Sequence, residues 1–311
     1  MKEILALTIP FFGIIFLGVL ARFFGFFDHS AGRILSRFAF FFVLPAFMFI
    51  SIISTPFSNI INVDFIVRYE AVTIIVFLMG LLLSSSLHLS GTERGIFALN
   101  TAYPNYGYIG IPLAILAFGE SAIAPMALIM ICDNLLLMIL TTFSARDAKN
   151  TGILASLSQS FKSMGKNPLI LSVLAGFLFS ALEIKIPKAP MFFLDMLAGA
   201  AAPSALFALG ITLVGQPIKG AILELKAIVV TKLLIHPMLM ASIMLWGSDF
   251  DLVWIQTAIL FSCLPIAANV FALSEFYNSY QGRTATSIMI STLFASVSVP
   301  ATLYMITLLG K

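Results

Sequence analysis

The sequence predicts an all-α polytopic membrane protein whose ten transmembrane helices form two inverted repeats of five. The first observation is composition: 60% of the 311 residues are hydrophobic and 10% are charged, whereas soluble domains carry about 25% charged residues. The second is a series of ten apolar segments, and the third is one sizeable polar stretch, residues 144–167, that separates them into five and five. A lipid bilayer is therefore the predicted partner of most of the chain's surface.

Each segment is close to the roughly 20 apolar residues that a helix needs to cross the hydrocarbon core. The first lacks the small-residue cleavage site of a signal peptide and is predicted to remain a helix. The sixth is short, and an earlier start near Phe161 also fits. Only Gly119, Glu120 and Ser121 separate the fourth from the fifth, which predicts a tight hairpin. The predicted spans are 4–24, 34–53, 65–87, 95–118, 122–143, 168–182, 190–214, 222–246, 252–277 and 285–309.

The distribution of lysine and arginine predicts the orientation in the cell (plasma or inner) membrane. Eleven of these residues fall on one set of loops and flanks and five on the other, and cytoplasmic loops carry the excess of positive charge. This pattern predicts that the N-terminus and the C-terminus lie outside and that the central loop is cytoplasmic.

The two halves are predicted to be inverted copies of one another. Five helices per half is an odd number, so the second half must insert in the opposite orientation. Pro45 precedes Pro104 by 59 residues in the first half, and Pro203 precedes Pro265 by 62 in the second. Such repeats are typical of secondary transporters. The predicted units are residues 1–143, the connecting loop 144–167 and residues 168–311.

Two of the predicted helices are interrupted near their midpoints by proline in the neighbourhood of asparagine. The fourth contains Asn100, Pro104 and Asn105, and the ninth contains Pro265 and Asn269. Proline removes a backbone N–H and clashes with the preceding turn. Irregular backbone at membrane depth is tolerated only where protein or a water-filled cavity surrounds it. Matched breaks in two halves therefore indicate the binding site of a secondary transporter.

Crossing of the two broken helices would direct two half-helix N-termini into one cavity. Their partial positive charge and free N–H groups suit a carboxylate, and asparagine amides add donors without burying a charge. The alternative is a pair of kinked helices whose asparagines cap the freed carbonyls. The predicted substrate-binding residues are Asn100, Tyr103, Pro104, Asn105, Gly107, Pro265 and Asn269.

Three titratable residues lie well inside predicted spans. A carboxylate at the bilayer centre costs about 3 kcal/mol and usually faces the protein interior, so Asp133 is expected either to couple transport to H⁺ or Na⁺ or to lock its helix to a broken neighbour. Lys232 is expected to pair with Asp133 or attract an anion, unless it snorkels to the membrane surface. His236, before Pro237, is expected to bond freed backbone rather than relay protons, and Glu70 is assigned to a membrane interface.

Enzymatic signatures are missing from the sequence. It contains no P-loop, no dinucleotide-binding glycine pattern, no zinc-type histidine spacing and no serine elbow. Both cysteines, Cys132 and Cys263, lie in apolar spans and are expected to be small core residues. We therefore expect no enzyme, no nucleotide-driven pump, no cofactor, no metal and no nucleic-acid partner.

Three stretches share the motifs of one known family. They are Asn105-Tyr106-Gly107-Tyr108-Ile109-Gly110-Ile111-Pro112-Leu113, Pro265 to Asn269 followed by Phe271, Leu273, Ser274 and Tyr277, and Lys232-Leu233-Leu234 with Pro237. They resemble the fourth, ninth and eighth helices of the auxin efflux carrier family, and the ten-span plan matches over nearly the whole chain. The short central loop resembles the bacterial malate and malonate permeases of that family rather than the plant PIN-type carriers.

The resemblance implies a fold akin to bile-acid symporters and sodium–proton antiporters. It implies a scaffold of spans one, two, six and seven, a transport domain of spans three to five and eight to ten, and elevator-type motion in a homodimer. Its crossover residues map to Pro104, Asn105, Pro265 and Asn269. The predicted function is secondary active transport of small organic anions, above all carboxylates. The alternatives are a sodium-coupled symporter of larger amphipathic anions and a membrane receptor that binds an anion without moving it.

Overall fold

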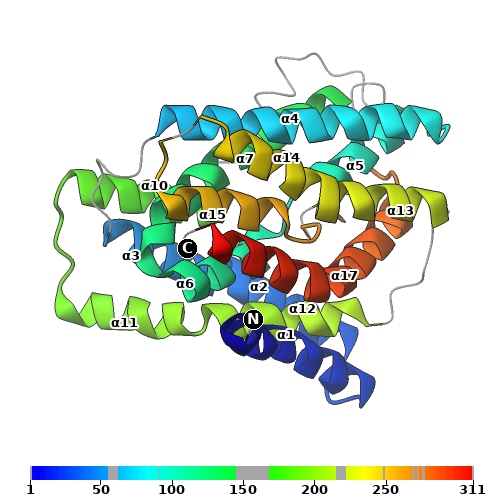
Figure 1. Cartoon of the computed structure of the whole chain (residues 1–311). Helices are drawn as coiled ribbons and strands as arrows, with labels where there is room; N and C mark the ends of the chain where they lie inside the picture. The colour runs from blue at the N-terminus through cyan, green and yellow to red at the C-terminus, as the bar shows by residue number, and fades with distance from the viewer. Residues whose placement is uncertain are drawn as a thin grey trace. The chain divides into compact units, whose positions relative to one another are not determined.

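The computed structural model describes residues 2–54, 62–89, 91–144, 168–214, 222–247, 249–267, 270–271, 273–274 and 277–309. These residues form α-helices, short π-helical and 3-10 turns, and one isolated antiparallel bridge (Figure 1). Six helical stretches are long and apolar enough to cross a membrane: Ser30–Ile53, Val63–Ser86, Tyr106–Asp133, Lys188–Leu213, Ile222–Leu245 and Gln281–Leu308. Shorter apolar helices include Phe12–Phe23, Ile170–Ala181 and Leu252–Ser262. The predicted class, an all-helical polytopic membrane protein, agrees with this architecture.

The chain divides into two compact units. The first contains residues 1–62, 107–130 and 165–215, and the second contains residues 63–106, 131–164 and 216–311. The described parts of predicted spans one, two, six and seven all fall in the first unit. Residues 107–130, which the sequence assigned to the fourth and fifth spans, fall there too.

The first unit is built from two closely packed helix pairs. Its helices are α1 (Lys2–Phe23), α2 (His29–Phe38), α3 (Leu44–Ile53), α6 (Ile111–Phe118), α10 (Pro168–Ala181), α11 (Lys188–Gly199) and α12 (Ala201–Leu213), with the first part of α7 (Ile123–Ser144). Helix α1 packs along α12, and α10 packs along α3 (Figure 1). Glycines permit the close approach, because a Cβ at Gly18 would collide with Phe207 and one at Gly176 with Ile52.

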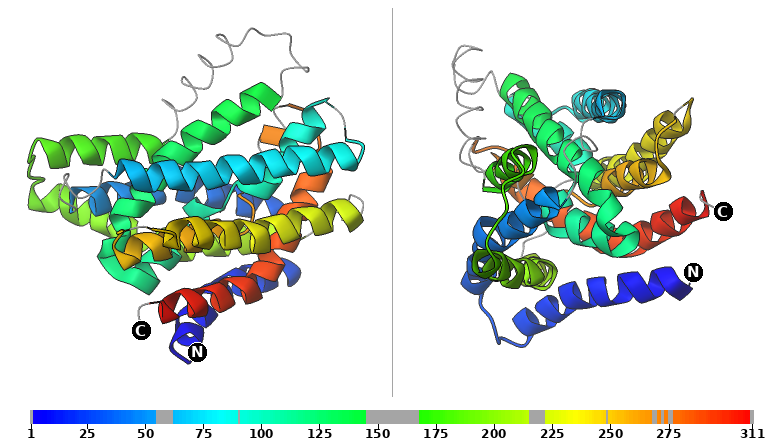
Figure 2. Two further views of the ribbon diagram at one scale, coloured as in Figure 1. Left: turned by 45° about the horizontal axis from the view of Figure 1, so that its top comes forward. Right: turned by 90° about the vertical axis from the view of Figure 1, so that its left-hand side faces the viewer.

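The second unit contains the first half of predicted span four and the described part of predicted span nine. Its helices are α4 (Val63–Ser86), α5 (Gly91–Ala102), α13 (Ile222–Val230), α14 (His236–Leu245), α15 (Leu252–Ser262) and α17 (Gln281–Leu308), with the rest of α7. Helix α4, seen along its axis in the right-hand view of Figure 2, packs against α5 and α14. Helix α15 packs between α14 and α17.

Prolines account for three π-helical turns. The turns η1 (Ala39–Val43), η3 (Tyr106–Gly110) and η5 (Thr231–Ile235) each end just before an α-helix that carries proline in its first turn. These prolines are Pro45, Pro112 and Pro237. Because proline has no N–H to donate to the preceding turn, a wider turn accommodates it without ending the helix.

A side chain caps the first turn of helix α2. This cap, Asp28, lies just before the candidate membrane span Ser30–Ile53. Asp28 accepts hydrogen bonds from the backbone N–H of Ala31 at 2.8 Å and from the Ser30 hydroxyl at 2.7 Å. The Ser30 hydroxyl and then the Ala31 N–H hold the pKa of this carboxyl below its usual value. An aspartate at this position satisfies an N–H that the helix itself leaves unbonded.

Candidate functional site at the paired helix breaks

Both predicted breaks are present, and they lie against each other. Helix α5 ends at Ala102 and α15 ends at Ser262, and residues 103–105 and 265–267 are not helical. Pro104 and Ile266 form an antiparallel bridge. The backbone N–H of Asn105 donates to the carbonyl of Pro265 at 2.8 Å, and that of Ala267 donates to the carbonyl of Tyr103 at 3.2 Å. Each break thus satisfies backbone groups of the other, which is how an interrupted helix can persist away from water.

The side chain of Lys232, on η5, reaches the C-terminal end of α15. Its side chain is fully buried, and Nζ donates to the carbonyl oxygen of Ser262, the last residue of that helix, at 2.8 Å. Nζ also lies 3.1 Å from Nδ1 of His236, one turn further along the chain. A cation at a helix C-terminus is favoured by the helix dipole. The side chain therefore points into the second unit and does not snorkel, and His236 contacts the lysine rather than freed backbone.

Asn100 lies on the buried face of α5, close to the break. Its Nδ2 donates to the carbonyl of Ile96 at 2.8 Å and to the hydroxyl of Thr284 on α17 at 3.2 Å. Its Oδ1 is buried and has no hydrogen-bond partner among the described residues. The Asn100 amide is therefore held between α5 and α17, and its Oδ1 remains available to accept a hydrogen bond.

Two tyrosines line the first break. The hydroxyl of Tyr106 donates to that of Tyr103 at 2.9 Å, and their rings meet edge to face with centroids 5.6 Å apart. The ring of Tyr106 also stacks on Phe261 of α15. Asn105 and Pro104 are buried, and Gly107 is half-buried at the start of η3. Asn269, the remaining predicted binding residue, lies outside the described residues.

A group of buried ionisable side chains accompanies the breaks in the second unit. Asp133 on α7 is fully buried, and its carboxylate faces the hydroxyl of Thr73 on α4. Glu70 on α4 and Lys232 on η5 belong to the same compact unit as Asp133. No ion pair joins Asp133 to Lys232 among the described residues, so their expected pairing stays a prediction.

Glu70 is the residue of this group that sequence reasoning missed. Both of its carboxylate oxygens are buried and lack a partner among the residues described, and its position near a membrane interface stays a prediction. The signal was available in the helical period: Glu70 stands three and seven residues before Thr73 and Phe77, which are buried on α4. Residues at these spacings share one helix face.

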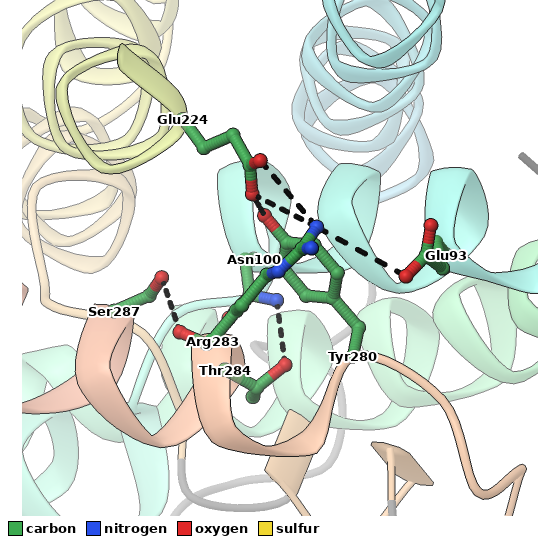
Figure 3. A network of polar contacts seen from close by, with 7 residues as sticks. All are labelled: Glu93, Asn100, Glu224, Tyr280, Arg283, Thr284 and Ser287. Atoms are coloured by element: carbon green, nitrogen blue, oxygen red, sulfur yellow. Dashed lines mark hydrogen bonds and ion pairs between the residues drawn. The ribbon is translucent and has the colours of Figure 1, made fainter. Parts of the chain in front are cut away.

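A second polar network joins three helix beginnings (Figure 3). Arg283 of α17 lies 3.3 Å from a carboxylate oxygen of Glu224 on α13 and 3.9 Å from one of Glu93 on α5. The hydroxyl of Tyr280 donates to Glu224 at 2.5 Å, and the Arg283 guanidinium lies 5.1 Å from the centroid of its ring. Burial, and next the bond to Glu224, raise the pKa of the Tyr280 phenol. This network ties α5, α13 and α17 together at one end.

The comparison with known proteins identifies the family. A family model described as membrane transport protein matches residues 4–303. This chain belongs to the membrane transport protein family. The resemblance to auxin efflux carriers is thereby confirmed, and the protein is a multi-pass membrane transporter of a small molecule rather than an enzyme.

Two relatives carry names that bear on the substrate. The chain is 36% identical over 315 residues to a "putative malonate transporter" of Rhizobium meliloti (strain 1021), covering 98% of this chain and 97% of that protein. It is 26% identical over 319 residues to the lysosomal cholesterol signaling protein of Mus musculus, covering 93% of this chain but 36% of the mouse protein. The match to the first relative covers nearly all of both chains, whereas the match to the second covers about a third of the mouse protein.

Proposed function

We propose that this protein is a secondary active transporter of small carboxylates, with malonate as the first substrate to test. The observation that carries the proposal is the backbone pairing of Tyr103, Pro104 and Asn105 with Pro265, Ile266 and Ala267. Paired interruptions at membrane depth provide backbone groups that can contact a substrate. The name of the Rhizobium meliloti relative supports a dicarboxylate.

The proposed binding site comprises Asn105, Asn269 and the N–H groups that follow each break. The first turn after a break carries a partial positive charge and donors that favour an anion. Lys232 adds a positive charge at the end of α15. Asn100 and Tyr103 are proposed to shape the wall of the site, and Pro104, Gly107 and Pro265 to keep the backbone open.

We further propose an inverted-repeat architecture and an elevator-type motion. The packing of α1 on α12 and of α10 on α3 supports the repeat. Span one corresponds to span six and span two to span seven, so the pair of spans one and seven has its counterpart in the pair of spans six and two. Spans one, two, six and seven are proposed to be the scaffold, and spans three to five and eight to ten to carry the substrate. A homodimer in the cell membrane, with both termini outside and the 144–167 loop in the cytoplasm, completes this proposal.

Counterflow of labelled malonate into proteoliposomes tests the function and the site together. We expect counterflow by the native protein, its loss in the Asn105→Ala, Asn269→Ala double variant, and normal counterflow in Ser242→Ala, an exposed position on α14. Counterflow should be lost because the double variant removes both asparagine amides from the proposed carboxylate-binding site. Unchanged counterflow in the double variant would refute the site, and no counterflow of any small dicarboxylate by the native protein would refute the function.

Two other functions have distinct readouts, and the first of them also has support from a relative. The name of the mouse relative favours a signalling role, which would appear as ligand binding without counterflow. A sodium-coupled symporter of larger amphipathic anions would instead require sodium for uptake. Asp133 is proposed as the coupling residue in either transport scheme, and an Asp133→Asn variant with unaltered pH and sodium dependence would contradict that role.

A further inference from the structure

A side chain of α17 holds the backbone of the second break. The N–H of Ile266, which directly follows Pro265, donates to Oγ of Ser291 at 3.2 Å. Ile266 and Ser291 are both fully buried. The Ser291 hydroxyl donates its own proton to the carbonyl of Ile288, one turn earlier in α17, at 3.0 Å. Because that proton is used within the helix, the lone pairs of Oγ are left to accept from the break.

The hydrogen bond to Ser291 completes the pairing of this stretch of backbone. Helix α15 ends at Ser262, so Ile266 lies beyond its regular hydrogen bonds. The backbone groups on either side of the Ile266 N–H bond the first break, at Asn105 and Tyr103. A buried N–H without a partner is costly where no water can reach it. The α17 hydroxyl supplies the partner that the opposite break does not.

The same face of α17 also holds the first broken helix. Thr284 lies seven residues before Ser291, and residues two turns apart share one helix face. The Thr284 hydroxyl accepts from Nδ2 of Asn100 at 3.2 Å (Figure 3). Asn100 stands two residues before α5 ends at Ala102. One face of one helix therefore bonds a residue at each of the two breaks.

We propose that Ser291 is a positioning residue for the substrate site and that α17 thereby ties the two broken helices together. The rigid helix fixes the spacing of the hydroxyls it carries, so the bonds through Thr284 and Ser291 set where each break lies. Ser291 acts through the backbone of residues 265–267 and does not itself touch the substrate. Its effect on binding rests on the proposed function, whereas the bond that holds Ile266 does not.

Hydrogen–deuterium exchange of the purified full chain tests this bond without any substrate. We expect Ser291→Ala to speed exchange in peptides that contain residues 264–267 by about three- to tenfold, the range for one hydrogen bond of ordinary net strength. Ser287→Ala is the matched control and should leave this exchange unchanged. Ser287 is fully buried in the same helix, and its hydroxyl bonds the carbonyl of Arg283 within that helix at 2.8 Å (Figure 3). Unchanged exchange in Ser291→Ala, or equal acceleration in both variants, would overturn the proposal.

Malonate binding separates positioning from a purely structural role. We expect Ser291→Ala to weaken the malonate dissociation constant, measured by isothermal titration in detergent, by about three- to tenfold. Ser287→Ala also loses one buried hydroxyl and should bind as the native protein does. Native affinity in Ser291→Ala would overturn the positioning role, because a purely structural hydroxyl changes stability without changing the affinity of the folded protein. If the native protein binds no malonate, the proposed function fails, while the exchange result still decides whether Ser291 holds the break.

Discussion

At the scale of single residues, Lys232 connects η5 to the helix break. Its ammonium bonds the Ser262 carbonyl at 2.8 Å, and it belongs to the same compact unit as the buried Asp133. Lys232→Met should lower the free energy of unfolding by about 3 kcal/mol, because it leaves a helix end unbonded and buried carboxylates without a counter-charge. Thermal unfolding in detergent measures this loss. Lys226→Met, at an exposed position on α13, is the matched control, and equal stability of the two variants would show that the α15 end needs no cation.

Single residues also differ in how far their positions could be predicted from the sequence alone. The breaks were predictable because Pro104 and Pro265 act on the backbone beside them, whatever surrounds the helix. Asp133 stood out because a carboxylate in an apolar segment is rare. The burial of Glu70 depends on which face of α4 meets its neighbours, and the link between Lys232 and Ser262 depends on tertiary packing across 30 residues. Neither follows from local composition.

At the scale of helices, close packing in the first unit rests on glycine. A Cβ at Gly210 of α12 would collide with the backbone carbonyl of Ile15 on α1, whereas a Cβ at Gly13 of α1 would meet nothing within 4 Å. Gly210→Ala should therefore lower the free energy of unfolding by about 1–3 kcal/mol through overpacking. Gly13→Ala should be neutral or raise it by up to about 1 kcal/mol, because alanine favours the helix. Thermal unfolding of the two variants side by side checks this, and equal destabilisation would rule out the close contact.

The π-helical turns are the part of the helix architecture that the sequence did not predict. The prolines that follow them were visible, but a proline in a membrane helix is compatible with a kink, a break or a wider turn. Pro104 and Pro265 interrupt their helices, whereas Pro45 and Pro237 follow η1 and η5 and leave the chain helical. Pro104 and Pro265 differ from Pro45 and Pro237 in their surroundings, because the backbone at each break hydrogen-bonds to the backbone of the other break.

At the scale of the whole molecule, ligand binding and folding stability are linked. A ligand that binds only the folded state raises the free energy of unfolding by about 2.7 kcal/mol at 100 times its dissociation constant. Malonate should therefore raise the unfolding temperature of the native protein, and removing it by dialysis should reverse the shift. Its dimethyl ester has the same skeleton without the charges and should cause no shift, because the half-helix N–H groups favour an anion.

The Asn105→Ala, Asn269→Ala double variant gives this whole-molecule prediction its control. Without ligand it should unfold near the native temperature, and malonate should no longer stabilise it. A shift that persists in the double variant would place the anion elsewhere in the protein. An equal shift from the ester would mean that the site recognises the carbon skeleton rather than the carboxylates, which would favour the larger amphipathic ligands of the alternative symporter. Stabilisation by malonate that depends on sodium rather than on pH would argue against H⁺ as the ion coupled at Asp133, because a coupled proton ties ligand affinity to pH.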